Sequence, residues 1–262
     1  MMTSSELKAF LDEMTARYNR PEFISTDPVA IPRSFSSREN IEIAGFLTAT
    51  LAWGSRKTII SRAASLMRLL DNQPYDYIMQ GSPADYNSVL DFCYRTFNGL
   101  DAQFFLTSLR NLYQNHGGLE KVFSDGYRSG GSVKAALRHF HSLFFELSHP
   151  ERTRKHVSDV TKGSAAKRLN LFLRWMVRND NRVDFGLWKQ IPASALMLPL
   201  DVHTSRTARG LGILRRKQND WLAVEEVTAV LRDFDPDDPV RYDFALFGLS
   251  VTEDYFESIL AP

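Results

Sequence analysis

Two charged residues, each at the predicted start of a helix, are the first candidates for chemistry in this sequence. Asp201 directly precedes a basic segment, so its carboxylate is placed to cap a helix that begins one residue later. Lys167 follows Gly163 and Ser164, and we expect Gly163 to turn the chain in a left-handed conformation and Ser164 to cap the next helix. An amine and a carboxylate at helix starts on a basic surface suggest nucleophilic chemistry on the sugar of a nucleic acid.

The surroundings of Lys167 favour a reactive amine. The positive charges of Lys162 and Arg168 are close in sequence, and the start of a helix carries a partial positive charge. These surroundings disfavour the ammonium form, so we expect a lowered pKa for Lys167, which makes a lysine nucleophilic. The ordinary alternatives are that Lys167 is a surface lysine meeting phosphate or water, and that Asp201 only caps its helix.

The segment after Asp201 has the pattern of a phosphate-binding helix. Arg206 and Arg209 lie about one turn apart on the expected helix, and His203 lies near its start. Free backbone N–H groups at a helix start bind phosphate well, and arginine side chains add to this binding. We predict that phosphate is bound by Gly163, Ser164, Arg168, His203, Arg206 and Arg209.

Apolar residues at helical spacing recur along almost the whole chain, and no segment shows the alternation of a strand, so we expect an all-α fold. The segment 159–164 is predicted to end one helix and start the next. The helix over residues 40–53 is apolar on most sides, which predicts a central position. The organisation is either one all-α body over residues 1–262 or two helical lobes with a groove between them. Helices are predicted at residues 4–18, 40–53, 57–70, 100–113, 119–127, 132–147, 202–214 and 240–249.

Composition limits the classes of site that the chain can build. The single cysteine, Cys93, excludes an internal disulfide and a four-cysteine iron–sulfur or zinc site, and we expect no cofactor and no metal. The start of the sequence lacks a signal-peptide pattern and no apolar run reaches about 18 residues, so we expect a cytoplasmic protein without a membrane partner.

The net charge is +1, but the charges are unevenly distributed. Residues 151–182 hold nine Lys or Arg against three Asp or Glu, and residues 221–262 hold two against ten. This segregation indicates either a phosphate-binding face or ordinary solvated helix faces.

Three segments resemble the helix-hairpin-helix DNA glycosylases. Residues 200–206 and 209–212 resemble their Val-Asp-x-His and Arg-Leu-Gly motifs, and residues 163–167 resemble their Gly-Val-Gly-x-Lys hairpin. The whole chain also resembles an uncharacterised bacterial family, through residues 167–178 and 242–249. The resemblance implies a glycosylase-like fold with the helix-hairpin-helix region at about residues 150–214. The longer connection at residues 184–198 is most similar to the archaeal 8-oxoguanine glycosylase type.

The resemblance also implies a base-excision repair activity on double-stranded DNA. In the family, the hairpin lysine attacks the sugar of a damaged nucleotide flipped from the duplex, and a Schiff base then allows strand cleavage as an AP lyase. By position, Lys167 is the nucleophile and Asp201 is the activating carboxylate. A second alignment places Arg174 at the lysine position, where no Schiff base can form. A flipped base needs an aromatic wall, for which we predict Trp53 and Trp188, with Arg174 also in the pocket.

Two other functions are compatible with the same residues. The chain could be a non-catalytic nucleic-acid-binding protein of this fold, or a nucleotide or small-molecule enzyme that uses the same groove. The damaged base and the oligomeric state are not predicted by the sequence.

Overall fold

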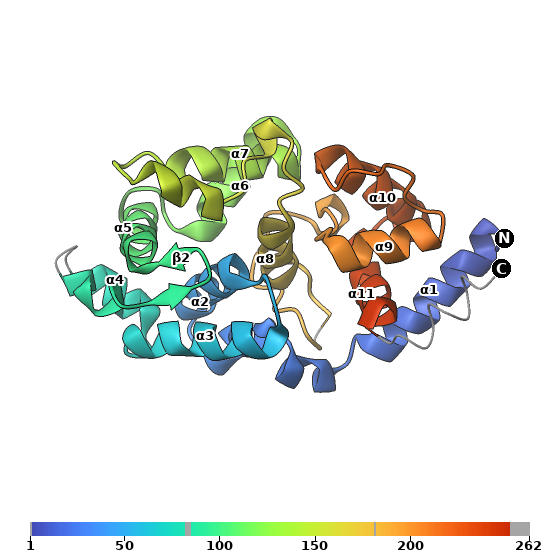
Figure 1. Cartoon of the computed structure of the whole chain (residues 1–262). Coiled ribbons are helices and arrows are strands. Elements are labelled where there is room, and N and C mark those ends of the chain that lie inside the picture. The colour runs from blue at the N-terminus through green and yellow to red at the C-terminus, as the bar shows by residue number, and fades with distance from the viewer. Residues whose placement is uncertain (1, 82–84, 181, 252–262) are drawn as a thin grey trace. The chain divides into compact units, whose positions relative to one another are not determined.

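The computed structural model describes residues 2–81, 85–180 and 182–251, and most of these residues lie in helices, as the sequence predicts (Figure 1). The chain divides into two compact units: a terminal unit, Met1–Phe23 with Val160–Pro262, and a central unit, Ile24–Asp159. A single domain over residues 1–262 stays a prediction. Residues 252–262 of the acidic end lie outside the described residues. None of the described helices is long and apolar enough to cross a bilayer.

The terminal unit is built around one apolar core that four of its helices share. Helix α1 packs on α11, and α11 packs on α9. Leu11, Ala208, Val227 and Leu246, one from each of α1, α9, α10 and α11, are fully buried in this core. The helices of the unit are α1 (Ser4–Tyr18), α8 (Lys167–Val177), α9 (Val202–Gly210), α10 (Trp221–Phe234) and α11 (Asp243–Val251), with 3₁₀ turns η6 (Val160–Lys162), η7 (Ala193–Ala195) and η8 (Pro239–Tyr242).

Helix α11 approaches α1 so closely that one position requires glycine. A Cβ atom at Gly248 would lie 2.3 Å from Cδ2 of the Tyr18 ring. We therefore expect Gly248→Ala to lower the free energy of unfolding by about 1–3 kcal/mol through overpacking, even though alanine favours helix. Urea unfolding measures this change. The control, Ser250→Ala on the same helix, should stay within about 0.5 kcal/mol of the parent, and equal losses in both variants would contradict the packing argument.

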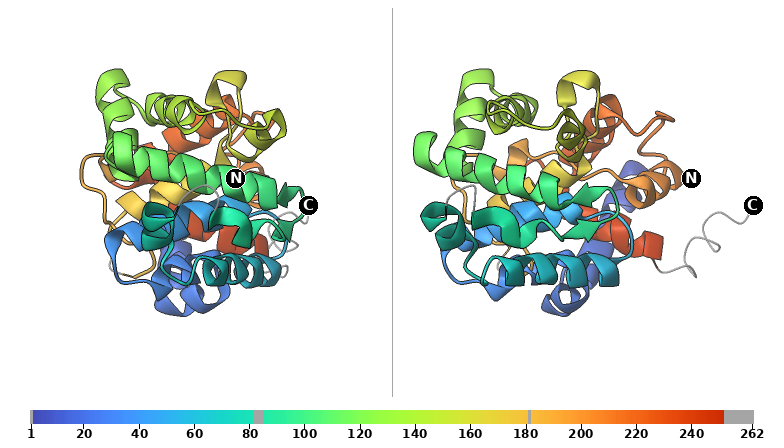
Figure 2. Two further views of the ribbon diagram at one scale, coloured as in Figure 1. Left: turned by 90° about the vertical axis from the view of Figure 1, so that its left-hand side faces the viewer. Right: turned by 60° about the vertical axis from the view of Figure 1, so that its left-hand side comes forward.

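The central unit is organised around α2, which is buried along nearly its whole length, as its apolar sequence predicts. The ring of Phe46 on α2 lies within contact distance of Phe105, Phe140 and Phe144. Helices α6 and α7 form a hairpin, light green in Figure 2, with Gly131 between them in the left-handed conformation. The helices are α2 (Arg38–Leu51), α3 (Arg56–Leu69), α4 (Pro74–Gln80), α5 (Gly99–Asn115), α6 (Leu119–Gly130) and α7 (Val133–Phe144), with 3₁₀ turns η1 (Pro21–Thr26), which crosses the unit boundary, η2 (Pro28–Ala30), η3 (Pro32–Ser34), η4 (Asp85–Val89) and η5 (Glu151–His156).

A small β-hairpin in the central unit departs from the sequence prediction, which contained no strand. Strand β1 (Cys93–Tyr94) pairs antiparallel with β2 (Phe97–Asn98), and Arg95 in the turn between them has a positive φ of 55°. Strands of two residues are too short to produce a detectable alternation of apolar and polar residues. The hairpin therefore leaves the all-α class of the fold unchanged.

Candidate functional site

Lys167 is the first residue of α8 and follows a tight turn. Gly163 has a φ of +82°, so the predicted left-handed turn is confirmed. The predicted N-cap is wrong: the helix is capped at Ala166, which has a φ of +48°, and not at Ser164. Ser164 instead forms an isolated bridge with Asp220, and its hydroxyl accepts a hydrogen bond from the backbone N–H of Ala166 at 3.2 Å. This distant pairing, which the local sequence does not reveal, moves the helix start to Lys167.

The segment before the turn also differs from the prediction that residues 159–164 end a helix. Only the single 3₁₀ turn η6 precedes Gly163, closed by a hydrogen bond from the Gly163 backbone N–H to the Val160 carbonyl at 3.2 Å. Val160 is the one buried residue of η6, so the segment has no apolar face along which a longer helix would pack. The turn at Gly163 therefore directly follows a 3₁₀ turn, and no α-helix lies between Val160 and the start of α8.

Asp201 caps α9, as the sequence predicts. Its Oδ1 atom accepts hydrogen bonds from the backbone N–H groups of His203 at 2.8 Å and Thr204 at 2.9 Å. The Thr204 hydroxyl in turn accepts a hydrogen bond from the Asp201 backbone N–H at 2.8 Å, which completes a capping box. These bonds fix the orientation of the carboxylate.

The fixed carboxylate faces the amine of Lys167. Lys167 Nζ lies 3.5 Å from Asp201 Oδ2, and the two side chains are 30% and 19% exposed. Because Oδ1 is held by the cap and Oδ2 by Lys167, each carboxylate oxygen has a separate partner. The structure thus brings together the two residues that the sequence predicts to act together, and both can be reached from solvent. Their catalytic roles stay a prediction.

A third charged residue, Asp243, belongs to the same cluster. It is the first residue of α11, is 5% exposed, and accepts a hydrogen bond from Nη1 of Arg174. The pKa of Asp243 is raised to about 6, chiefly by burial and also by the negative charge of Asp201, while the charges of Arg174 and Lys167 oppose the rise. The charges of Lys167 and Asp201 therefore both affect the pKa of Asp243. The sequence analysis missed this residue, whose one signal was an aspartate within the apolar run 242–249.

The electrostatic link between Asp243 and the pair can be measured. We expect the pKa of the Asp243 carboxyl to fall in Asp201→Asn, which removes a neighbouring negative charge, and to rise in Lys167→Met, which removes a positive one. Carbon-detected NMR titration of the aspartate carboxyls between pH 4 and pH 8 measures both shifts. Exchange of the exposed Lys162, which precedes Gly163, for Met is the control and should change the pKa much less. Equal shifts in all three variants would contradict the cluster.

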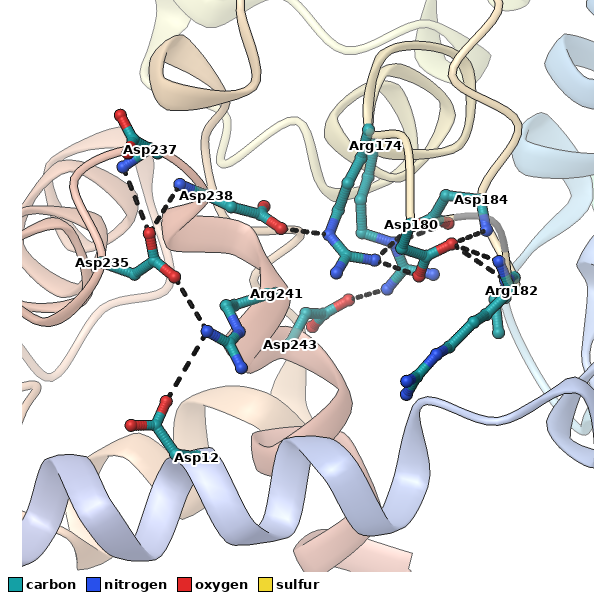
Figure 3. A network of polar contacts seen from close by, with 12 residues as sticks. Asp12, Arg174, Asp180, Arg182, Asp184, Asp235, Asp237, Asp238, Arg241 and Asp243 are labelled. Carbon is teal, nitrogen blue, oxygen red and sulfur yellow. Dashed lines mark hydrogen bonds and ion pairs between the residues drawn. The ribbon is translucent and has the colours of Figure 1, made fainter.

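Arg174, predicted for the base pocket and for the alternative lysine position, lies in the interior of the terminal unit. Its side chain is 4% exposed and lies between Asp243 and Asp184, with 3.3 Å between Nε and Oδ1 of Asp184 (Figure 3). Its guanidinium carbon is 4.4 Å from the centroid of the Phe244 ring. Arg174 therefore forms a buried ion pair beneath the exposed pair.

The ion-pair network continues along α8 to Arg178. Its guanidinium bonds to Asp184 at 2.9 Å and to Asp238 at 2.8 Å, and also pairs with Asp180. Burial raises the pKa of both Asp184 and Asp238, although the arginines oppose this shift. Arg174 and Arg178 are buried and paired with carboxylates. The interpretation of the whole basic stretch 151–182 as a phosphate-binding face is therefore corrected, because these two arginines neutralise buried carboxylates inside the terminal unit.

The residues predicted to bind phosphate have different environments. His203 and Arg206 are exposed on α9. Arg209 donates hydrogen bonds to the carbonyls of Arg216 and Lys217, both at 2.9 Å, so it stabilises the turn after α9. Burial lowers the pKa of Arg168 to about 10, which leaves it charged at neutral pH. Binding of DNA by these residues stays a prediction.

The two tryptophans predicted for the base pocket lie in different units. Trp188 is 1% exposed and packs edge-on against Phe172 in the terminal unit, with the ring centroids 5.3 Å apart. Its ring is covered in this structure and presents no surface on which a base could stack. Trp53 follows α2 in the central unit, is half-buried, and lies 4.8 Å from the Arg95 guanidinium.

The described residues offer no metal site. No three His, Cys, Asp or Glu side chains in the ranges 2–81, 85–180 and 182–251 are grouped to hold an ion. The carboxylates of the buried network face arginines, which occupy the positions that a cation would need. Cys93 is exposed on β1.

Comparison with known proteins identifies the family of the chain. A family model described as "Protein of unknown function (DUF2400)" matches residues 27–252, which include Lys167, Asp201 and Asp243. The chain belongs to the DUF2400 family. This match confirms the prediction that the chain belongs to an uncharacterised family. No curated protein and no solved structure matches this DUF2400 protein.

Proposed function

We propose that this DUF2400 protein is a DNA-repair glycosylase with AP-lyase activity on an oxidised or otherwise damaged base. The observation that carries the proposal is the 3.5 Å separation of Lys167 Nζ and Asp201 Oδ2, in a pair that remains partly exposed. The resemblance of residues 163–167 and 200–212 to helix-hairpin-helix DNA glycosylases supports the same roles. Lys167 is the nucleophile, and Asp201 is its activating carboxylate.

The reaction begins with proton transfer. The Lys167 ammonium gives its proton to Oδ2 of Asp201, and the neutral amine attacks C1′ of the deoxyribose. The C1′–N bond to the base breaks, and the base leaves with the bonding electrons. Opening of the sugar ring then gives an imine between Lys167 and C1′. The protonated Asp201 then gives this proton to the departing base, and the restored carboxylate stabilises the positive charge of the protonated imine.

The start of α9 is suited to hold the DNA backbone close to this pair. Asp201 uses the N–H groups of His203 and Thr204, and the exposed side chains of His203 and Arg206 extend from the same helix end. Cationic side chains near a helix start attract phosphate oxygens. A flipped sugar bound here would meet Lys167, while its flanking phosphates meet Arg206.

Borohydride trapping tests the chemistry without knowledge of the preferred lesion. Duplexes that contain an abasic site, 8-oxoguanine or no damage are incubated with the full chain and sodium borohydride, which reduces the imine to a stable secondary amine. We expect a covalent adduct with the abasic duplex and none with the intact duplex. An adduct with 8-oxoguanine as well would show base release before imine formation.

The same experiment separates the competing functions. Absence of an adduct with every damaged duplex contradicts the lyase activity. If fluorescence titration at two salt concentrations then shows salt-sensitive duplex binding, the protein is a non-catalytic nucleic-acid-binding module. Weak duplex affinity together with retention of a small ligand would indicate a small-molecule enzyme.

A further inference from the structure

Helix α3 of the central unit, labelled in Figure 1, carries positive charges and no negative charge. Its sequence contains four Lys or Arg residues and neither Asp nor Glu. The apolar residues on one side of the helix are buried. Cations and hydroxyl groups form the opposite side, which consists of the exposed or half-buried residues Lys57, Thr58, Ser61, Arg62, Ser65 and Arg68. We call this side the α3 face.

The cations of the α3 face have no carboxylate partner. Lys57, Arg62 and Arg68 are exposed and form no ion pair with any residue that the structure describes. In contrast, Lys121 on α6 of the same unit pairs with Asp125 at 2.6 Å. Pairs of this kind, four residues apart, are a common way to balance charge on a surface helix. Because α3 has no such pair along the α3 face, its positive charge is available to an external anion.

Arg95 extends the positive charge beyond the start of α3. A Cβ atom at Gly54 would lie 2.8 Å from Nη2 of Arg95, so the guanidinium lies against the turn that leads into the helix. The guanidinium carbon is also 4.8 Å from the centroid of the Trp53 ring, while the Arg95 side chain remains exposed. Stacking on an indole restrains a guanidinium without neutralising it. Trp53 therefore holds a fourth cation in place at this end of the α3 face.

The composition of the α3 face matches the phosphate backbone of a nucleic acid. Lys, Arg, Ser and Thr side chains are typical contacts of DNA phosphates. Lys57 and Arg68 lie about 16 Å apart along the helix axis, which corresponds to roughly five phosphates along one strand of B-form DNA. A helix that lies on a membrane presents large apolar side chains beside its cations. Among the described residues of α3, no large apolar side chain is exposed, so the face favours nucleic acid over a lipid surface.

We propose that the α3 face and Arg95 form a surface that binds the phosphate backbone of duplex DNA. The surface belongs to the central unit and is separate from the residues of the terminal unit to which the glycosylase chemistry is assigned. It does not depend on that chemistry, because intact and damaged duplexes present the same phosphates. Its loss is therefore expected to weaken binding of every duplex, whereas loss of Lys167 removes the trapped adduct.

Fluorescence anisotropy of the full chain with a labelled, undamaged duplex between about 50 and 200 mM salt tests the surface. The variant that combines Lys57→Ala, Arg62→Ala and Arg68→Ala removes three cations at positions where alanine favours helix. We expect its slope of log affinity against log salt to be smaller than that of the parent by about 2.7, or about 0.9 for each phosphate contact. At about 0.1 M salt the affinity should fall about a hundredfold. Arg95→Asn, which tolerates the positive φ, should lower the slope by about 0.9.

A second triple variant controls for net charge. Lys121→Ala, Arg128→Ala and Lys134→Ala remove three exposed cations of α6 and α7 in the same unit and should keep the parent slope. Thermal unfolding checks that the variants are folded; if the α3 variant is not, the single changes Lys57→Ala and Arg68→Ala carry the test with about 0.9 each. An undiminished slope in the folded α3 variants, or an equal loss in the control, would overturn the proposal. Failure of the parent to bind the duplex, with or without binding to phosphatidylserine vesicles, would overturn it as well.

Discussion

Replacement of Lys167 by alanine is expected to reduce the borohydride-trapped adduct to background, about a thousandfold or more, because the nucleophile itself is lost. The Lys167 side chain is partly exposed, so its truncation to alanine leaves little buried volume unfilled. The variant should therefore fold with nearly the parent stability. Single-turnover trapping on the abasic duplex, quantified by gel electrophoresis, measures the loss.

Two further variants are compared with Lys167→Ala: one tests the activating carboxylate and the other is a control. Asp201→Asn keeps a side chain that caps helices well, so α9 should remain intact while the adduct forms about 10²–10⁴-fold more slowly. Lys162→Ala removes a neighbouring exposed lysine and should trap as efficiently as the parent. Trapping that survives in Lys167→Ala and disappears in Lys162→Ala would contradict the assignment of the nucleophile.

The Lys167–Asp201 pair could be predicted because local rules place both residues. Asp201 is fixed by capping chemistry that involves only the next three residues. Lys167 follows a glycine whose positive φ is the feature expected of such a turn. Neither rule gives the distance between them, and that came from the packing of the terminal unit.

The rest of the site depended on contacts between distant segments. Arg174 lies in a sequence that reads as a basic helix face, yet its partner Asp243 is 69 positions away. Ser164 has the chemistry of an N-cap but pairs with Asp220 instead. A count of charges along the sequence cannot separate a buried arginine, paired with carboxylates, from an exposed one that could meet phosphate.

Replacement of Arg174 by methionine is expected to lower the free energy of unfolding by about 3–5 kcal/mol at pH 8. Methionine fills much of the volume of the arginine side chain, so the loss is chiefly electrostatic. Asp184 keeps its bond to Arg178, whereas Asp243 loses the ion pair that opposes its desolvation. Removal of one partner leaves a buried charge uncompensated. Urea unfolding of the variant and the parent measures the difference.

The pH dependence distinguishes this mechanism from a general loss of packing. Without Arg174 the pKa of Asp243 rises further above about 6, so the carboxyl takes up a proton as the pH falls and the uncompensated charge disappears. The destabilisation should therefore shrink between pH 8 and pH 5, and Asp243→Asn should recover part of it when added to Arg174→Met at pH 8. Arg206→Met, at an exposed position of α9, is the control and should stay within about 0.5 kcal/mol of the parent. A loss that is the same at both pH values, and that Asp243→Asn does not relieve, would show that Arg174 stabilises the unit by its volume and not by its charge.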